Sequence, residues 1–185
     1  MALLNPCGRV TYLILWIGAV RLASGQVQAQ SVDEYQVKAA FLYNFAKFVE
    51  WPPHKGPDDS FVICVLGRSP FGPLLEQAVR GKQIEGRALI VREISEVRDA
   101  SGCQILYVPA SENKRIPAIL DKLKTDAVLT VGETQTFAAD GGVINLKVEG
   151  GKVHLEVNMC AAERVKLHIS SKLLSLATIV KDKKQ

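Results

Sequence analysis

Three short apolar segments constrain the fold of this 185-residue chain more than any other feature. They are 61–66 (FVICVL), 105–108 (ILYV) and 127–131 (AVLTV). The last is too apolar to alternate between a buried and a solvent-facing side, which is typical of a strand covered on both faces. Segments whose apolar residues have the spacing of a helix lie between these runs, most clearly 116–123 (IPAILDKL). Strands that alternate with helices predict an α/β layered domain with a largely parallel sheet.

The pattern changes in the last third of the chain. Residues 141–148 and 152–157 alternate polar and apolar side chains around the turn Glu149-Gly150-Gly151, which predicts an antiparallel hairpin. Helical segments are expected to follow at 161–167 and 170–180, with Ser170 as a helix cap. The expected fold is therefore α/β, with a C-terminal antiparallel hairpin and helices added to the sheet.

The N-terminus has the layout of a secretory signal peptide. Arg9 precedes an apolar run at 11–20, and Val27-Gln28-Ala29 is a small-residue cleavage pattern. Ten apolar residues in a helix reach only about 15 Å, half of the hydrocarbon core of a membrane, so an anchor is disfavoured. We expect residues 1–29 to be removed and residues 30–185 to form a single periplasmic domain. Cleavage after Gly25 is the alternative.

Residues 31–51, just after the expected cleavage site, also have the pattern of a helix. Ser31 and Glu34 fit a capping box at its start, and Pro52-Pro53 is expected to stop it.

Composition excludes several functions for the remaining 156 residues. They carry 21 basic and 19 acidic residues, a net charge of +2, which gives no electrostatic reason to expect a nucleic-acid partner. The 3 histidines and the widely spaced cysteines show no metal-ligand spacing, so no metal or cofactor is expected. The sequence has no nucleophile elbow and no paired titratable groups that suggest a cleft, so we predict no catalytic residues and no enzyme.

Export changes how the cysteines are interpreted. Cys64 and Cys103 each lie in or beside an apolar run, and neighbouring strands can bring such residues within bridging distance. An oxidising compartment favours a disulfide, whereas two buried free thiols are the alternative. Cys160 is then left over.

One loop is a candidate for binding a small anion. Gly67-Arg68-Ser69 follows the first apolar strand and precedes a short helix, where backbone N–H groups bind anions in α/β folds. The Lys-Ser/Thr pair that ends a P-loop is missing, since Pro73-Leu74 stand in its place. A plain turn between strand and helix is the alternative.

Six ordered segments resemble the YfiR family of periplasmic proteins over residues 34–181. They are YQVKAAFLYNFAKFVEWP (35–52), FVICVLGRSPFG (61–72), VLTVGE (128–133), FAADGGVINL (137–146), VHLEVNMCAAER (153–164) and ISSKLLSLATIV (169–180). The resemblance implies an α/β fold, often dimeric, that restrains a membrane-bound diguanylate cyclase by binding its periplasmic region. Release of this restraint raises cyclic di-GMP and favours biofilm formation, and an outer-membrane lipoprotein sequesters the repressor.

The resemblance also assigns roles to single residues. Cys64 and Cys103 match the disulfide pair of the family, whereas a second bridge of some members has no counterpart here. The hairpin and the helix after it are the expected partner-facing surface, because a hairpin added to a sheet can expose a face or an edge. Its residues are Ile144, Leu146, Leu155, Glu156 and Ala162. For each apolar residue, a place in the core is the alternative.

Two functions follow from these observations. The first is a non-catalytic periplasmic repressor of a membrane diguanylate cyclase, which lowers cyclic di-GMP and biofilm formation. The alternative is a periplasmic sensor that binds a small molecule through residues 67–72 and has no cyclase partner.

Overall fold

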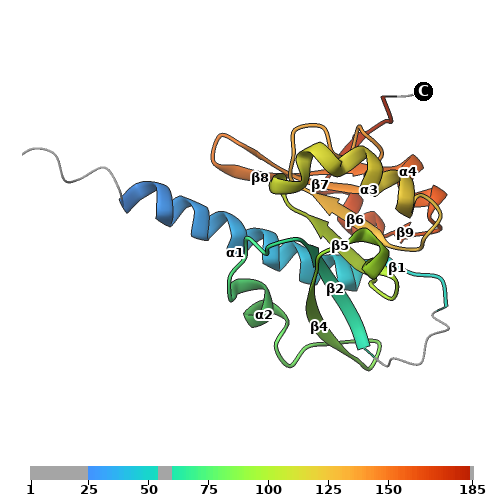
Figure 1. Cartoon of the computed structure of the whole chain (residues 1–185), viewed down its shortest axis with the longest axis horizontal. Coiled ribbons are helices and arrows are strands. Elements are labelled where there is room, and N and C mark those ends of the chain that lie inside the picture. The colour runs from blue at the N-terminus through green and yellow to red at the C-terminus, as the bar shows by residue number, and fades with distance from the viewer. Residues whose placement is uncertain (1–24, 54–59, 184–185) are drawn as a thin grey trace, which may run out of the picture.

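A computed structural model describes residues 25–53 and 60–183, and its centre is an eight-stranded sheet (Figure 1). The strand order is β10-β8-β7-β6-β5-β2-β4-β3. Every adjacent pair is parallel except β7–β8 and β3–β4. The predicted α/β fold with a largely parallel sheet and an antiparallel C-terminal hairpin is confirmed. The strands are β2 (Ser60–Leu66), β3 (Gln83–Ile84), β4 (Arg87–Ile94), β5 (Ile105–Val108), β6 (Leu129–Gly132), β7 (Ile144–Glu149), β8 (Lys152–Asn158) and β10 (Thr178–Val180).

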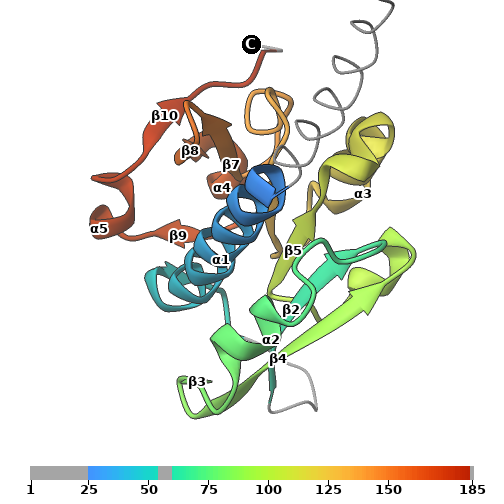
Figure 2. The same ribbon diagram turned by 90° about the vertical axis from the view of Figure 1, so that its left-hand side faces the viewer.

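Helices cover both faces of this sheet. One buried cluster joins it to α1, α2, α4 and α5, and a second joins it to α3 and η1. Alternate residues of β2 divide between the two, since Ile63 belongs to the first and Cys64 to the second. Figure 2 shows α1 crossing one face, with α3 on the other side of β5. The helices are α1 (Gly25–Phe48), α2 (Leu74–Val79), α3 (Ile116–Leu123), α4 (Met159–Arg164) and α5 (Ser171–Leu174), with 3-10 turns η1 (Val97–Ala100) and η2 (Ala110–Arg115).

Helix α1 begins earlier than the sequence predicts. It starts at Gly25, so the expected start at Ser31 is wrong. Residues 25–30 (GQVQAQ) contain no proline and include good helix formers, so nothing in them forces the helix to begin later. The helix ends at Phe48, before Pro52-Pro53, and leads into a short antiparallel ribbon of β1 (Val49–Glu50) and β9 (His168–Ile169). Residues 1–24 of the predicted signal peptide lie outside the described residues, and its last five positions, 25–29, belong to α1.

The predicted helix over 170–180 is only partly present. Ser170 does cap α5, since its hydroxyl accepts the Leu173 N–H, but that helix ends at Leu174. Residues 178–180 (TIV) form β10 instead and pair in parallel with β8. Thr178, Ile179 and Val180 are all β-branched, and β-branched residues favour extended backbone. The apolar residues of this segment have helical spacing, but its strand propensity and the free edge of β8 favour a strand at 178–180.

We expect Gly142→Ala to destabilise the domain, because the ring of Phe137 occupies the space of a side chain there. A Cβ built on Gly142 lies 2.2 Å from a ring carbon, and one built on Gly132 lies equally close at 2.2 Å. Overpacking of this kind lowers the free energy of unfolding by about 1–3 kcal/mol, measurable by urea denaturation. Phe137→Leu in the same chain should recover part of that loss, and strictly additive losses would contradict the assigned clash.

Candidate functional site

The carboxyl ends of β2, β5 and β6 meet at one edge of the sheet. From β2 the chain runs outward to β4, and then returns to β5 on the other side of β2. In open α/β sheets, such a change of direction is the place where ligands bind, outside the carboxyl ends of the strands. The predicted anion loop, 67–69, follows β2 at this edge.

The polar groups of this loop are bonded within the protein, as in an ordinary turn between a strand and a helix. The Gly67 N–H donates to the Ile94 carbonyl at 2.7 Å, and the Ser69 hydroxyl accepts the Phe71 N–H at 3.3 Å. A carboxylate oxygen of Glu112 lies 2.9 Å from the position of a Cβ on Gly67. Arg68 is exposed to solvent. These contacts favour the plain turn, and a ligand role for Gly67, Arg68 and Ser69 stays a prediction.

A buried ion pair occupies the same edge of the sheet. Lys38 on α1 is 1% exposed, and its ammonium donates to Glu133, just after β6, at 2.5 Å. The Glu133 side chain is 5% exposed. Lys38 also donates to Glu34 one helical turn earlier. Because a buried charge is tolerated only when it is paired, this contact fixes the middle of α1 against the end of the sheet.

Glu133 accepts three further hydrogen bonds. The donors are the Tyr107 hydroxyl at 2.7 Å, the Tyr35 hydroxyl at 3.3 Å and the Ala110 N–H at 2.7 Å. Burial by itself would raise the pKa of Glu133, but the charge of Lys38 and the hydrogen bonds hold this pKa below its ordinary value. Burial, followed by the Glu133 charge, raises the pKa of Tyr35 and of Tyr107.

This cluster is built to hold elements together. The Glu133 carboxylate is anionic and saturated with donors, so it is a poor general acid or base. It joins α1, the end of β5 and the end of β6 through Lys38, Tyr107 and Glu133. Sequence reasoning missed it because Lys38 and Glu133 are 95 residues apart. The one available signal was a lysine among the apolar residues of the N-terminal helix.

Four of the five residues expected to face a partner lie in the core. Ile144, Leu146, Leu155 and Ala162 are at most 4% exposed and belong to the main hydrophobic cluster. The expectation that they form a surface is corrected, and the core alternative holds. The reason is that the hairpin face carrying Ile144, Leu146 and Leu155 packs with residues of α1 and α4 in that cluster.

The fifth residue, Glu156, is partly accessible at the outer side of the hairpin. Its side chain is 18% exposed, accepts a hydrogen bond from Asn145 at 3.0 Å and lies 3.9 Å from the Lys147 ammonium. It pairs in register with Thr178 of β10.

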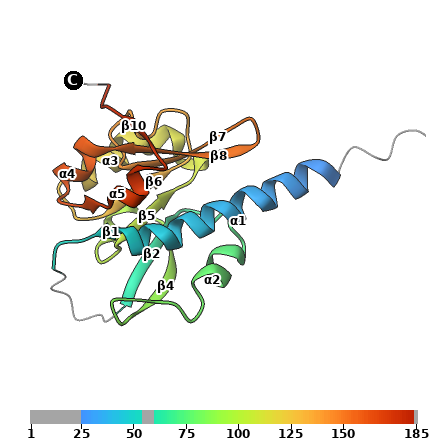
Figure 3. The same ribbon diagram turned by 180° about the vertical axis from the view of Figure 1, so that it is seen from behind.

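Among residues 25–53 and 60–183, the outer strands of the large sheet are β3 and β10, and the most exposed apolar side chains gather at β10. Leu176 is 73% exposed and Ile179 is 51% exposed, the two highest values among the large hydrophobic side chains described. Figure 3 shows β10, α5 and the hairpin together at one end of the molecule, with α2 and β4 beyond α1. We call Leu176 and Ile179 the β10 edge. It combines exposed apolar side chains with an unpaired strand edge, two features of a protein-binding surface.

Cys64 and Cys103 form a disulfide, as the sequence and the resemblance predicted. Their Cα atoms are 5.9 Å apart, within the normal range for a bridge, and both side chains are buried. The bond links β2 to the residues that lead into β5. Cys160 is a free, partly buried thiol.

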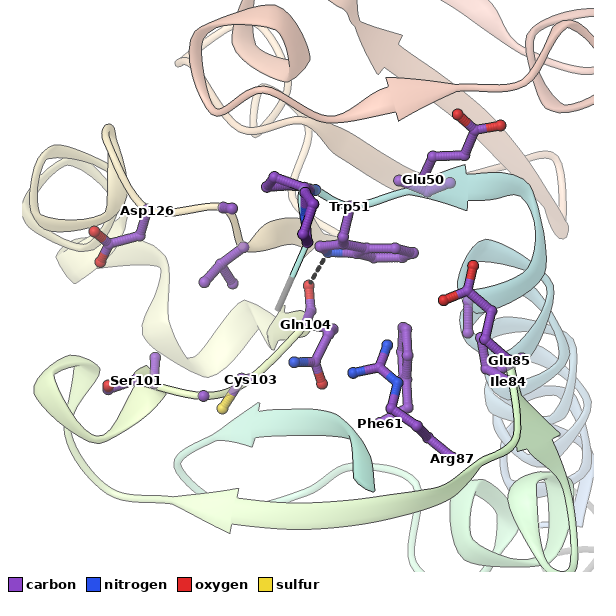
Figure 4. A pocket seen from close by; sticks show the side chains of 18 of the residues that line it. Glu50, Trp51, Phe61, Ile84, Glu85, Arg87, Ser101, Cys103, Gln104 and Asp126 are labelled. Carbon is purple, nitrogen blue, oxygen red and sulfur yellow. Dashed lines mark hydrogen bonds between the residues drawn. The ribbon is translucent and has the colours of Figure 1, made fainter. Parts of the chain in front are cut away.

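A large cavity lies at the opposite end of the sheet, where β2, β5 and β6 begin (Figure 4). Its volume is about 1200 Å³, and Trp51, Phe61, Arg87 and Gln104 are among the residues that line it. Sequence reasoning did not find this cavity, because its walls come from five separate segments, within 46–53, 61, 83–87, 100–104 and 125–128.

The described residues also bear on two other possibilities, a metal site and a helix that could span a membrane. Within residues 25–53 and 60–183, no group of three or more His, Cys, Asp or Glu is arranged to hold a metal ion. None of the helices described there is long and apolar enough to cross a membrane.

Comparison with solved structures supports the fold. A conserved domain protein from Vibrio cholerae O1 biovar El Tor superposes with a TM-score of 0.52 at 13% identity, covering 80% of this chain and 60% of that one. An ABC domain from Streptococcus pneumoniae, solved with L-Trp, gives a TM-score of 0.48 at 11% identity, covering 65% and 55%. The chain thus spans little more than half the length of either protein.

Comparison of sequences identifies the family. No curated protein matches the chain. The model of the YfiR/HmsC-like family does match it, over residues 35–178, which run from within α1 to the first residue of β10. The disulfide and the strands β2 to β8 of the large sheet fall inside this region. The chain belongs to the YfiR/HmsC-like family.

Proposed function

We propose that this protein is a periplasmic repressor of a membrane-anchored diguanylate cyclase. It acts by binding the periplasmic region of the cyclase, which lowers cyclic di-GMP and biofilm formation. Membership of the YfiR/HmsC-like family over residues 35–178 carries this proposal. The signal-peptide pattern at 1–29 and the Cys64–Cys103 disulfide support export to an oxidising compartment.

The β10 edge is the surface that we assign to the cyclase. An extended segment of a partner can add to a free strand edge through backbone hydrogen bonds, while exposed apolar side chains supply specificity. Lys172 precedes the β10 edge in the sequence, Lys181 follows it, and both are exposed. Their charge favours an acidic partner segment and disfavours a second copy of the same edge.

The wider assembly is proposed from the family resemblance. The chain forms a homodimer through a face other than the β10 edge, and an outer-membrane lipoprotein draws the repressor away from the cyclase. Neither step requires a nucleic acid.

We expect Ile179→Lys to abolish repression without unfolding the protein. A lysine on an edge strand opposes strand addition, and Ile179 is already half exposed, so the melting temperature should change little. The measurement is intracellular cyclic di-GMP in a strain deleted for the gene and complemented with the variant. Ile90→Lys is the matched control, since Ile90 is 38% exposed on β4 at the far end of the sheet.

Deletion of the gene tests the function itself. Cyclic di-GMP should rise in the deletion strain, and the rise should vanish when the partner cyclase is also removed. No change during planktonic or surface growth would argue against a repressor. If deletion raises cyclic di-GMP but Ile179→Lys complements fully, the function stands and the assigned surface is wrong.

A further inference from the structure

The cavity at the amino ends of β2, β5 and β6 contains a cationic group with an unsatisfied atom. Nη1 of Arg87 is buried and has no hydrogen-bond partner in the residues described. The guanidinium lies over the Phe61 ring, 5.3 Å from its centroid. Figure 4 shows it directed into the space between Trp51, Phe61 and Gln104. A buried charged donor without an acceptor is costly, so this position calls for an anion.

The walls around this guanidinium are rigid and aromatic. The Trp51 and Phe61 rings meet edge to face at 5.0 Å, and the Trp51 indole N–H donates to the Gln104 carbonyl at 3.1 Å. The Gln104 side-chain oxygen in turn accepts the Val62 N–H at 2.7 Å. Cys103 lines the cavity and is held by its disulfide. This part of the cavity therefore offers two aromatic rings, held by neighbouring contacts, beside the Arg87 guanidinium.

Carboxylates at the rim restrict the charge of the ligand. Glu50, Glu85 and Asp126 line the same cavity and are exposed to solvent. These three carboxylates outnumber the one lysine of the described lining, Lys47, so the rim disfavours a dianion such as phosphate. One carboxylate matches the forked geometry of one guanidinium.

We propose that this cavity binds a small monocarboxylate with a planar apolar body, whose carboxylate contacts Arg87 and whose body packs on Trp51 and Phe61. The site is distinct from the predicted loop at 67–69, which lies at the other end of β2. The proposal does not depend on the cyclase partner.

The test uses the fluorescence of Trp51 in the protein that lacks residues 1–29. Trp51 is then the sole tryptophan, because the other is Trp16. Titration with benzoate should give a saturable change in its emission. The neutral isostere benzamide and inorganic phosphate should give none. Equal responses to benzoate and benzamide would show that the charge of Arg87 is not used, and no response to benzoate would overturn the proposal.

Variants separate Arg87 from other charged groups. Arg87→Gln should weaken benzoate binding by about ten- to a hundredfold, since a hydrogen-bonded charge is lost. Arg68→Gln, in the predicted anion loop, is the matched control and should bind like the parent. Circular dichroism confirms that each variant is folded.

Discussion

Glu133→Gln is expected to lower the free energy of unfolding by about 3–5 kcal/mol, as removal of one partner from a buried ion pair does. The variant leaves the Lys38 ammonium buried with a single carboxylate, Glu34, which is the more exposed of its two partners at 27%. It also weakens the acceptor for Tyr107 and Ala110. Urea denaturation followed by circular dichroism measures the loss.

Two variants control for this interpretation. Glu149→Gln removes one partner of the exposed Lys147–Glu149 ion pair and should leave stability nearly unchanged, because surface pairs contribute little. Lys38→Met combined with Glu133→Gln removes both charges, so it should recover much of the loss. If the double variant is as unstable as the sum of the single ones, the ion pair is not the cause.

The same carboxylate makes stability depend on pH. The pKa of Glu133 in the folded protein lies below its ordinary value of 4.5, so its contribution is fully present above about pH 4.5 and is lost as the pH falls through the folded-state pKa. The difference in stability between the parent protein and Glu133→Gln should therefore shrink as the pH falls below 4.5. A difference that stays constant down to pH 3 would contradict this assignment of charge.

Removal of the disulfide is the second change with a large expected effect. Replacing both Cys64 and Cys103 by alanine should lower the free energy of unfolding by about 4 kcal/mol, because their separation of 39 residues closes a long loop in the unfolded chain. The measurement is urea denaturation without reductant. Cys160→Ala is the control, since that thiol is free. The parent protein in reductant should match the double variant, and insensitivity to reductant would refute the predicted effect.

The sequence predicted the inner strands well, because buried parallel strands are continuous apolar runs. Residues 61–66 and 105–108 lie almost unchanged within β2 and β5. The hairpin at β7 and β8 was also recognisable, since alternation and a Gly-Gly turn are local signals. Local signals do not say which strand will lie beside which in the sheet. Nor do they say which helices will cover each face, and the interpretation of Ile144 and Leu155 as a surface failed because α1 and α4 pack on their face of the hairpin.

The cavity and the ion pair were out of reach for a related reason. Arg87 and Trp51 have no pattern in common, and Lys38 meets Glu133 only after the sheet has formed. Short local rules describe elements, whereas these sites depend on contacts between residues far apart in the chain. The disulfide was predictable because the chain has only 4 cysteines, and two of them lie in or beside apolar strands.

The place of β10 in the chain has a consequence for the order in which the sheet is completed. It is the last strand of the described sequence, yet it covers β8, which is continuous through the hairpin with the middle of the sheet. In a polypeptide that crosses a membrane N-terminus first, both cysteines of the bridge arrive more than 70 residues before Thr178. The bridged half of the sheet can therefore form while the edge of β8 is still bare and open to strand-pairing partners. A truncation that removes Thr178–Val180 would leave this edge of β8 bare in the folded protein as well.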